Sequence, residues 1–264
     1  MTATPLERFA AEARRRAESG MTARSLADHE SLLGRLPPAR PFASRLTRDA
    51  GATPRVIAEM KRSSPSAGLL RENYAPRQIA FGYARVGAAA LSVLTEPDAF
   101  GGDLSHLVEV RAAHLPTLRK DFLVTPYQIA ESRTAGADAV LLIAAVLPGP
   151  ALGIMLAACR RYGIEALVEV HGEEELSRAL GEGAGLIGVN NRDLHTMGVD
   201  LSVSERLSPK IPAGIVKVSE SGIRARADLD RLAKAGYDAF LVGEALMREA
   251  DPGDALWRLM HPEG

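Results

Sequence analysis

Polar side chains stand at the ends of several apolar runs of this chain, where they could carry acid–base chemistry. The first run ends with Glu59 and Lys61, the third with Lys120 and the fifth with Glu169. A positioned lysine can donate a proton to a reacting oxygen, and a positioned glutamate can accept one. Polar residues also end the sixth and seventh runs, namely Asn190, Arg192, Glu220 and Ser221.

Eight apolar runs predict the strands that would position these side chains. Their starts lie about 20 to 35 residues apart, and most are almost continuously apolar, as expected of strands buried on both faces. Segments typical of helices separate them, and Gly163 and Gly236 are signals for the ends of two of these helices. The runs cover residues 55–61, 89–97, 117–122, 138–146, 165–172, 185–194, 214–222 and 238–246, and the clearest helical segments are 76–87, 151–163 and 226–237.

This alternation predicts an α/β fold, a single (β/α)8 TIM barrel. Strands that alternate with helices imply parallel strands joined by right-handed crossovers, and eight repeats fit a barrel that typically takes about 250 residues. A doubly wound open sheet is the alternative. It would favour fewer strands and a GxGxxG loop after the first strand, and no such loop stands there.

We expect residues 1–264 to form one domain, in which an N-terminal helical extension, residues 1–50, precedes the barrel, residues 51–264. Within the extension, segments 7–18 and 23–36 have helical patterns. Prolines mark the connection to the first strand, at Pro37, Pro38 and Pro41.

Composition narrows the class of protein. The net charge of -1 gives no basic footprint for nucleic acid. No stretch reaches the roughly 20 apolar residues that a membrane helix needs, and the N-terminal stretch has no apolar core typical of a secretory signal. The lone cysteine, Cys159, has no partner for an internal disulfide, which fits a reducing compartment. We therefore expect a cytoplasmic protein that binds neither nucleic acid nor membrane.

We expect the charged side chains at the strand ends to lie together at one opening of the barrel, because barrels of this kind hold their active sites at the carboxyl ends of the strands. Glu59 and Lys61 point the same way, since strand side chains alternate faces. Opposite charges that meet there compensate one another and can bind a ligand. Any one of them alone is more often a solvated loop residue or part of a structural ion pair, so the hypothesis depends on the whole set.

Two further strand ends predict a phosphate site. The segments VSESGI and LVGEALM each turn through small residues directly into a helix, where backbone N–H groups can bind an anion. Glu244 would contribute through its backbone, because its carboxylate would repel a phosphate. The predicted members are Ser221, Gly222, Gly243 and Glu244, with the Ser64 hydroxyl as an addition from the loop after the first strand.

Other kinds of site are not supported by the sequence. The six histidines show no HxxxH or HExxH spacing, so no metal site is expected. His171, close after Glu169, is interpreted as a loop histidine, and Cys159 as a core residue.

The ordered motifs resemble the indole-3-glycerol phosphate synthase family of tryptophan biosynthesis. They read IAEMKRSSPSAG, LSVLTEPDAFGG, LRKDFLVTPYQI, DAVLLIAA, ALVEVH, IGVNNRDL, VSESGI and AFLVGEALM, and they extend from Val56 to Met247. The resemblance implies a cofactor-free and metal-independent enzyme. It would close the ring of 1-(2-carboxyphenylamino)-1-deoxyribulose 5-phosphate with loss of carbon dioxide and water.

The resemblance also implies roles for the strand-end residues. Lys120 would be the general acid and Glu169 the general base of dehydration. Lys61 would pair with the substrate carboxylate and could itself act as an acid, so which lysine acts at each step stays open. The groups that orient substrate and catalysts would be Glu59, Asn190 and Glu220, with Arg192 adding positive charge at the mouth. An apolar slot for the aromatic ring would be formed by Pro65, Phe100, Phe122, Leu141, Ile143, Leu194 and Leu241, although core packing is an equal alternative for Leu141 and Ile143.

Three alternatives stay open at this point. One is a barrel enzyme that forms a Schiff base on Lys120 or Lys61. Another is phosphoribosylanthranilate isomerase, which would need a cysteine at the end of the first strand, where Glu59 and Lys61 stand. The third is a barrel that binds phosphate without turnover. The family resemblance implies that the chain binds a phosphorylated small molecule. It also implies a monomer or a weak homo-oligomer, which could associate with other enzymes of the tryptophan pathway.

Overall fold

Eight parallel strands close into a barrel in the computed structural model, which describes residues 4–48, 52–193 and 196–261. Strand β1 pairs with β4 on one side and with β10 on the other, which completes the ring. Each predicted apolar run contains one of these strands, so the predicted (β/α)8 barrel is confirmed. The strands are β1 (Arg55–Met60), β4 (Ala90–Leu94), β5 (Thr117–Lys120), β6 (Ala139–Ile143), β7 (Glu165–Val170), β8 (Leu186–Asn190), β9 (Val216–Glu220) and β10 (Ala239–Val242).

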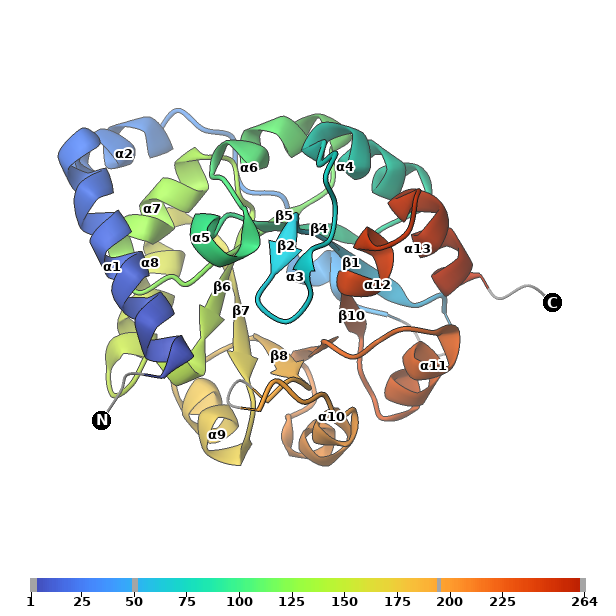
Figure 1. Cartoon of the computed structure of the whole chain (residues 1–264). Coiled ribbons are helices and arrows are strands. Elements are labelled where there is room, and N and C mark those ends of the chain that lie inside the picture. The colour runs from blue at the N-terminus through green and yellow to red at the C-terminus, as the bar shows by residue number, and fades with distance from the viewer. Residues whose placement is uncertain (1–3, 49–51, 194–195, 262–264) are drawn as a thin grey trace.

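Helices surround the barrel and connect its strands (Figure 1). Gly163 ends α8 in the left-handed conformation, with φ of 62°, as the sequence indicates. In the described part of the chain, no helix combines the length and the apolar character needed to cross a membrane. The helices are α4 (Pro76–Arg85), α5 (Pro97–Phe100), α6 (Ser105–Val110), α7 (Pro126–Thr134), α8 (Ala151–Tyr162), α9 (Glu173–Gly181), α10 (Ser202–Leu207), α11 (Arg226–Lys234), α12 (Glu244–Met247) and α13 (Pro252–Met260).

The core has two layers, as a barrel requires. One layer fills the space between strands and helices and includes Val56, Tyr83 and Phe240. The other fills the barrel itself, where Ile57 and Leu118 pack with side chains from the opposite strands. Since neighbouring strand residues alternate between the layers, the almost continuous apolar runs follow directly from burial on both faces.

The last part of the N-terminal segment, around α3 (Ala43–Leu46), closes the barrel at the amino ends of its strands, which is the lower end. The whole segment forms α1 (Pro5–Ala23), α2 (Leu26–Leu33) and the short α3, which the sequence pattern did not predict. Phe42 and Leu46 are fully buried in the inner layer of the core. The carboxylate of Glu165, the first residue of β7, accepts hydrogen bonds from the backbone N–H groups of Phe42 and Ala43, at 2.6 and 3.0 Å.

The loop after β1 contains a small antiparallel hairpin. Its strands are β2 (Ser63–Ser64) and β3 (Gly68–Leu69). Gly68 adopts a φ of 64°, which favours glycine at this turn. Figure 1 shows the hairpin in front of the barrel, on the side to which β1 leads. This hairpin brings the serines of the loop over the carboxyl end of the barrel.

We expect Phe42→Ala to lower the free energy of unfolding by about 3–5 kcal/mol, because it removes a fully buried aromatic ring from the barrel interior. Denaturant unfolding monitored by circular dichroism would measure the loss. Phe81→Ala is the matched control, since Phe81 is 45% exposed and its truncation should cost less than about 1 kcal/mol. Equal losses in the two variants would contradict the assignment of Phe42 as the plug of the barrel.

Candidate active site

A cavity of about 840 Å³ opens at the carboxyl ends of the barrel strands. Every strand end with predicted polar side chains contributes residues to the lining of this cavity. Leu194 lies outside the described residues. The other predicted site residues all line this cavity: Glu59, Lys61, Ser64, Pro65, Phe100, Lys120, Phe122, Leu141, Ile143, Glu169, Asn190, Arg192, Glu220, Ser221, Gly222, Leu241, Gly243 and Glu244.

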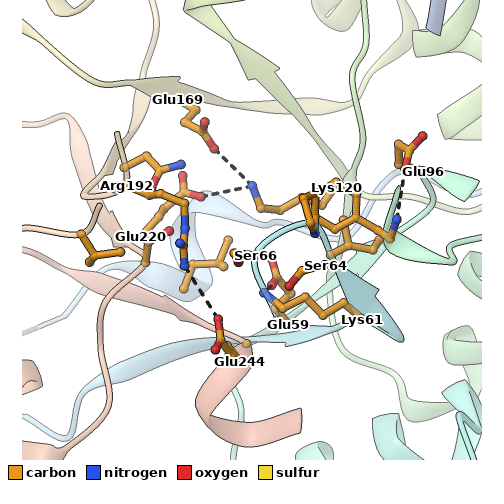
Figure 2. A pocket seen from close by; sticks show the side chains of 18 of the residues that line it. Glu59, Lys61, Ser64, Ser66, Glu96, Lys120, Glu169, Arg192, Glu220 and Glu244 are labelled. Atoms are coloured by element: carbon orange, nitrogen blue, oxygen red, sulfur yellow. Dashed lines mark hydrogen bonds and ion pairs between the residues drawn. The ribbon is translucent and has the colours of Figure 1, made fainter. Parts of the chain in front are cut away.

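Lys120 is the central cation of this cavity. Its Nζ atom lies 3.1 Å from Oε2 of Glu169 and 3.5 Å from Oε2 of Glu220. Figure 2 shows the three side chains converging from β5, β7 and β9. Both carboxylates are almost completely buried, whereas the Lys120 side chain keeps 17% exposure toward the cavity. The lysine can therefore meet a ligand while the two glutamates hold it in place.

Glu59 and Lys61 form a second pair at the end of β1. Nζ of Lys61 donates a hydrogen bond of 2.7 Å to Oε1 of Glu59. Glycines provide the room for the buried carboxylates, because a Cβ atom at Gly243 would collide with Glu59 and one at Gly188 would collide with Glu220. The strand-face argument thus accounts for the Glu59–Lys61 pair, with Gly243 after β10 as a further condition for it, and Gly188 on β8 is the corresponding condition for Glu220.

The charges of this cluster alter one another's proton affinities. Burial opposes the charge of Lys120, but the carboxylates of Glu169, Glu220 and Glu59 outweigh it and raise the pKa of Lys120. Burial also opposes the charge of Glu169, yet Lys120 and His171 hold the pKa of this carboxyl below its ordinary value. Burial raises the pKa of Glu220 to about 8; Lys120 opposes this rise, and the neighbouring Glu169 and Glu59 add to it. Near neutral pH, Lys120 is therefore a cation, Glu169 an anion and Glu220 largely a neutral acid.

The strand that carries Lys120 is anchored from behind by Arg119. Because strand side chains alternate faces, Arg119 points away from the cavity. Its buried guanidinium donates hydrogen bonds to Asp121, Glu131 and Thr95 at 3.0, 2.8 and 3.0 Å. This network fixes the backbone at the end of β5 and therefore the position of the Lys120 side chain.

The turns after β9 and β10 form the part of the cavity predicted to bind phosphate. Ser221 and Gly222 are both in the left-handed region, with φ of 66° and 81°. The side-chain amide of Asn191 holds this turn, donating hydrogen bonds to the backbone oxygens of Glu220 and Ser221 at 3.0 and 3.2 Å. Successive small residues in such a turn leave their backbone N–H groups accessible to an anion.

Arginines surround the carboxylate of Glu244, the first residue of α12. It accepts a hydrogen bond of 2.9 Å from Arg248 and lies 3.7 Å from the guanidinium of Arg192 (Figure 2). The backbone N–H of Arg192 in turn donates to Oδ1 of Asn190 at 3.0 Å. The ion pairs with Arg192 and Arg248 offset the negative charge of the Glu244 carboxylate. The carboxylate therefore repels less strongly a phosphate that binds the backbone N–H groups of the turn.

Helix α1 contributes residues to the cavity that the sequence analysis missed. Pro5, Leu6 and Phe9 line the wall formed by this helix. The ring of Phe9 stacks on Phe122, with 4.7 Å between centroids and 10° between planes. Nothing in the local sequence around Phe9 signals this contact, because it depends on how α1 lies across the barrel.

His171 follows β7 directly and contacts the site from outside the cavity wall. The sequence predicts a loop residue at this position, and in the structure the Nε2 atom of His171 lies 3.4 Å from Oε1 of Glu169. Burial opposes its positive charge, but Glu175, Glu169 and Glu220 raise the pKa of His171. Among the residues with a described placement, no group of three or more histidine, cysteine, aspartate or glutamate side chains could hold a metal ion.

Comparison with known proteins identifies the relatives of this chain. The family model described as indole-3-glycerol phosphate synthase matches residues 6–259. The indole-3-glycerol phosphate synthase of Carboxydothermus hydrogenoformans is 53% identical over 203 residues, covering 76% of this chain and 77% of that protein. The indole-3-glycerol phosphate synthase 2 of Streptomyces coelicolor is 51% identical over 221 residues, covering 83% and 84%.

More distant solved structures share the fold. Thiamine phosphate pyrophosphorylase from Pyrococcus furiosus superposes with a TM-score of 0.59 at 16% identity, over 83% of this chain and 96% of that one. The N-acetylmannosamine-6-phosphate 2-epimerase from Clostridium perfringens has a TM-score of 0.58 at 17% identity, over 80% and 92%. At this level of identity the likeness concerns the barrel alone.

We expect Glu220→Gln to change how stability depends on pH. The folded-state pKa of Glu220, about 8, lies above its ordinary value of 4.5. Between these two values the folded protein binds a proton that the unfolded chain has lost, so wild-type stability falls as pH rises. The glutamine variant lacks this loss, and its stability relative to wild type should therefore rise by up to about 1.4 kcal/mol per pH unit.

Denaturant unfolding of both proteins at pH 5, 6.5 and 8 would measure this difference. Glu205→Gln serves as a control, because Glu205 sits on the surface in an ion pair with Arg231 and the pKa of its carboxyl is lowered. A wild-type protein that gains stability over Glu220→Gln as pH rises would show that Glu220 is instead a stabilised carboxylate.

Proposed function

The chain belongs to the indole-3-glycerol phosphate synthase family, and from this premise we propose how its residues divide the reaction. The enzyme is a carbon–carbon lyase, EC 4.1.1.48. It converts 1-(2-carboxyphenylamino)-1-deoxyribulose 5-phosphate into indole-3-glycerol phosphate, carbon dioxide and water in tryptophan biosynthesis. The observation that carries the division of roles is the placement of Lys120 between two buried glutamates at the centre of the cavity.

In the ring closure, Lys120 acts as the general acid at the ribulose carbonyl. The aromatic carbon that bears the carboxylate attacks this carbonyl, and its oxygen gains negative charge. Because the surrounding carboxylates raise the pKa of Lys120, the lysine holds its proton throughout the neutral range. It gives the proton up only as the oxygen becomes strongly basic, so its stabilisation is greatest in the transition state.

In the later dehydration, Glu169 acts as the general base. The pKa of its carboxyl is lowered by Lys120 and His171, so it is ionised and ready to accept a proton at neutral pH. Its 3.1 Å contact with Lys120 lets a proton pass from the base to the acid once both have reacted. The proton that Glu169 takes from the substrate can thus replace one proton that Lys120 has donated in the same turnover.

Lys61 pairs with the substrate carboxylate before decarboxylation and stands as a second candidate acid. Its hydrogen bond to Glu59 keeps it at the edge of the cavity. Asn190 and Glu220 orient the substrate hydroxyls. A largely neutral Glu220 can donate a hydrogen bond to a substrate oxygen, which a carboxylate cannot do.

The aromatic ring of the substrate occupies the apolar side of the cavity. Pro65 faces this space from the hairpin after β1, Phe100 from the end of α5, and Leu141, Ile143 and Leu241 from the strands, while Phe9 stacks on Phe122. We include Leu194 in this slot on the family resemblance alone.

The phosphate group binds the turns after β9 and β10. Its oxygens accept hydrogen bonds from backbone N–H groups at Ser221, Gly222, Gly243 and Glu244, and from the hydroxyl of Ser64. Arg192 adds positive charge to this end of the cavity and keeps the Glu244 carboxylate engaged.

For the cellular setting we propose one domain, residues 1–264, in a cytoplasmic enzyme. The free thiol of Cys159 is buried and suits a reducing compartment. We propose a monomer or weak homo-oligomer that is open to association with other enzymes of tryptophan biosynthesis.

We expect Lys120→Ala and Glu169→Gln each to lower turnover at least about 100-fold, the lower range for removing acid–base help. The assay mixes each protein with 1-(2-carboxyphenylamino)-1-deoxyribulose 5-phosphate and follows the fluorescence of the indole product. Lys234→Ala is the control for the loss of a lysine, because this residue lies exposed on α11, and it should keep full activity. Full activity in both active-site variants would overturn the assigned roles.

We expect Gly222→Ala to raise KM about 10-fold while changing kcat less than about 3-fold, since it removes phosphate binding from ground state and transition state alike. A Cβ atom there would meet Val199 in a left-handed turn that disfavours alanine. Gly185→Ala is the matched control, because its Cβ would enter open space, and its kinetics should equal those of wild type. Unchanged KM in Gly222→Ala would argue against phosphate binding at this turn.

A further inference from the structure

Each turnover must take one proton from solvent, which follows from the charges of the substrate and products. The substrate carboxylate carries a negative charge and leaves as neutral carbon dioxide. The carbonyl oxygen takes up two protons and leaves as water, while only one proton is lost from the ring that becomes indole. Acid and base can exchange that one proton between them, but the second must be supplied from outside. This reasoning rests on the roles proposed for Lys120 and Glu169.

The side chains of the proposed acid, Lys120, and base, Glu169, have little direct access to water. Glu169 is only 3% exposed and Glu220 only 1%, while Lys120 is exposed toward the cavity that the substrate fills. An active site that excludes water around its substrate also restricts proton entry by the same route. Resupply therefore needs a path that does not cross the occupied cavity.

His171 and Glu175 form such a path behind the cavity wall. Oε1 of Glu169 lies 3.4 Å from Nε2 of His171, while Oε2 is the oxygen 3.1 Å from Nζ of Lys120. On the other edge of the imidazole, Nδ1 lies 3.3 Å from Oε2 of Glu175, which also accepts a 2.8 Å hydrogen bond from the backbone N–H of His171. Exposure increases along this line, because the side chains of Glu169, His171 and Glu175 are 3%, 17% and 25% exposed.

The contacts of the His171 imidazole suit proton transfer better than a fixed structural role. The buried Nε2 atom has no hydrogen-bond partner of good geometry among the described residues, although it faces Glu169. An imidazole can accept a proton at one nitrogen and release one from the other. Glutamates face it from three elements: Glu169 on β7, Glu175 on α9 and Glu220 on β9. Burial opposes a positive charge on the ring, but these glutamates outweigh it and raise the pKa of His171.

We propose that His171 and Glu175 form a proton relay that recharges the acid–base pair from solvent. In its protonated form His171 gives the Nε2 proton to Oε1 of Glu169 and keeps the Nδ1 proton. The neutral ring then turns so that its bare nitrogen takes up a proton that Oε2 of Glu175 has bound from water, and the recharged ring turns back toward Glu169. Rotation of the Glu169 carboxyl group presents this proton to Nζ of Lys120, which has given its own proton to the substrate oxygen. Each group ends the cycle in its starting state, and one proton has entered.

The test compares His171→Gln with wild type at saturating substrate in dilute buffer. We expect kcat of the variant to fall about 10-fold with KM changed less than about 2-fold, because binding groups are untouched while resupply is slowed. Added imidazole, or a higher concentration of a small buffer, should restore kcat of the variant at least about 3-fold and leave wild type unchanged. Glu175→Gln should show the same pattern at smaller size, and Glu174→Gln, the exposed neighbour on α9, should match wild type.

The pH profile separates a relay from a purely structural role. In wild type kcat should fall at high pH as His171 loses its proton, and this alkaline limb should be absent in His171→Gln and in a second variant, His171→Asn. A kcat equal to wild type in dilute buffer would overturn the relay, and so would a loss that neither imidazole nor pH affects. Failure of the proposed function is distinguishable, because it would appear as full activity in Lys120→Ala and Glu169→Gln.

Discussion

The site depends on one electrostatic constraint: three buried carboxylates share two lysines. Glu59, Glu169 and Glu220 are all nearly inaccessible, and the basic side chains that contact them include Lys61, Lys120 and His171. Unpaired charges are expensive in a protein interior. The excess negative charge is relieved by a proton on Glu220, whose pKa rises to about 8. The cluster therefore contains a proton donor, a proton acceptor and a largely neutral acid within one cavity.

The rest of the barrel is arranged to keep this cluster in place. Gly188 and Gly243 leave the volume that the carboxylates occupy, since a methyl group at either position would collide with them. Arg119 holds the end of β5 from the opposite face through hydrogen bonds that include those to Thr95, Asp121 and Glu131. Such preorganisation matters for catalysis because fixed charges need no reorientation as the transition state forms. The same low-dielectric surroundings that make the cluster costly to bury also strengthen its effect on a bound substrate.

Features that depend on local pattern could be predicted from the sequence, and features that depend on long-range packing could not. All eight strands follow from the apolar runs, and the meeting of Glu59, Lys120 and Glu169 follows from their shared position at strand ends. The stacking of Phe9 on Phe122 depends on the path of α1 across the barrel, for which the sequence carries no local signal. The raised pKa of Lys120 cannot be predicted from the sequence for a similar reason. It depends on the balance between burial and three carboxylates from different strands.

The N-terminal segment packs against the amino ends of the barrel strands, opposite the cavity at their carboxyl ends. Phe42 fills the lower end of the inner core, where its backbone is held by Glu165, the first residue of β7. Glu169 stands on the same strand at the upper end, and strand geometry places the two about 13 Å apart. Between them the barrel interior is apolar, so the charged cluster rests on a packed hydrophobic column. Stability and chemistry are therefore separated along the barrel axis, because the apolar column supplies the burial energy that offsets the cost of three carboxylates at its open end.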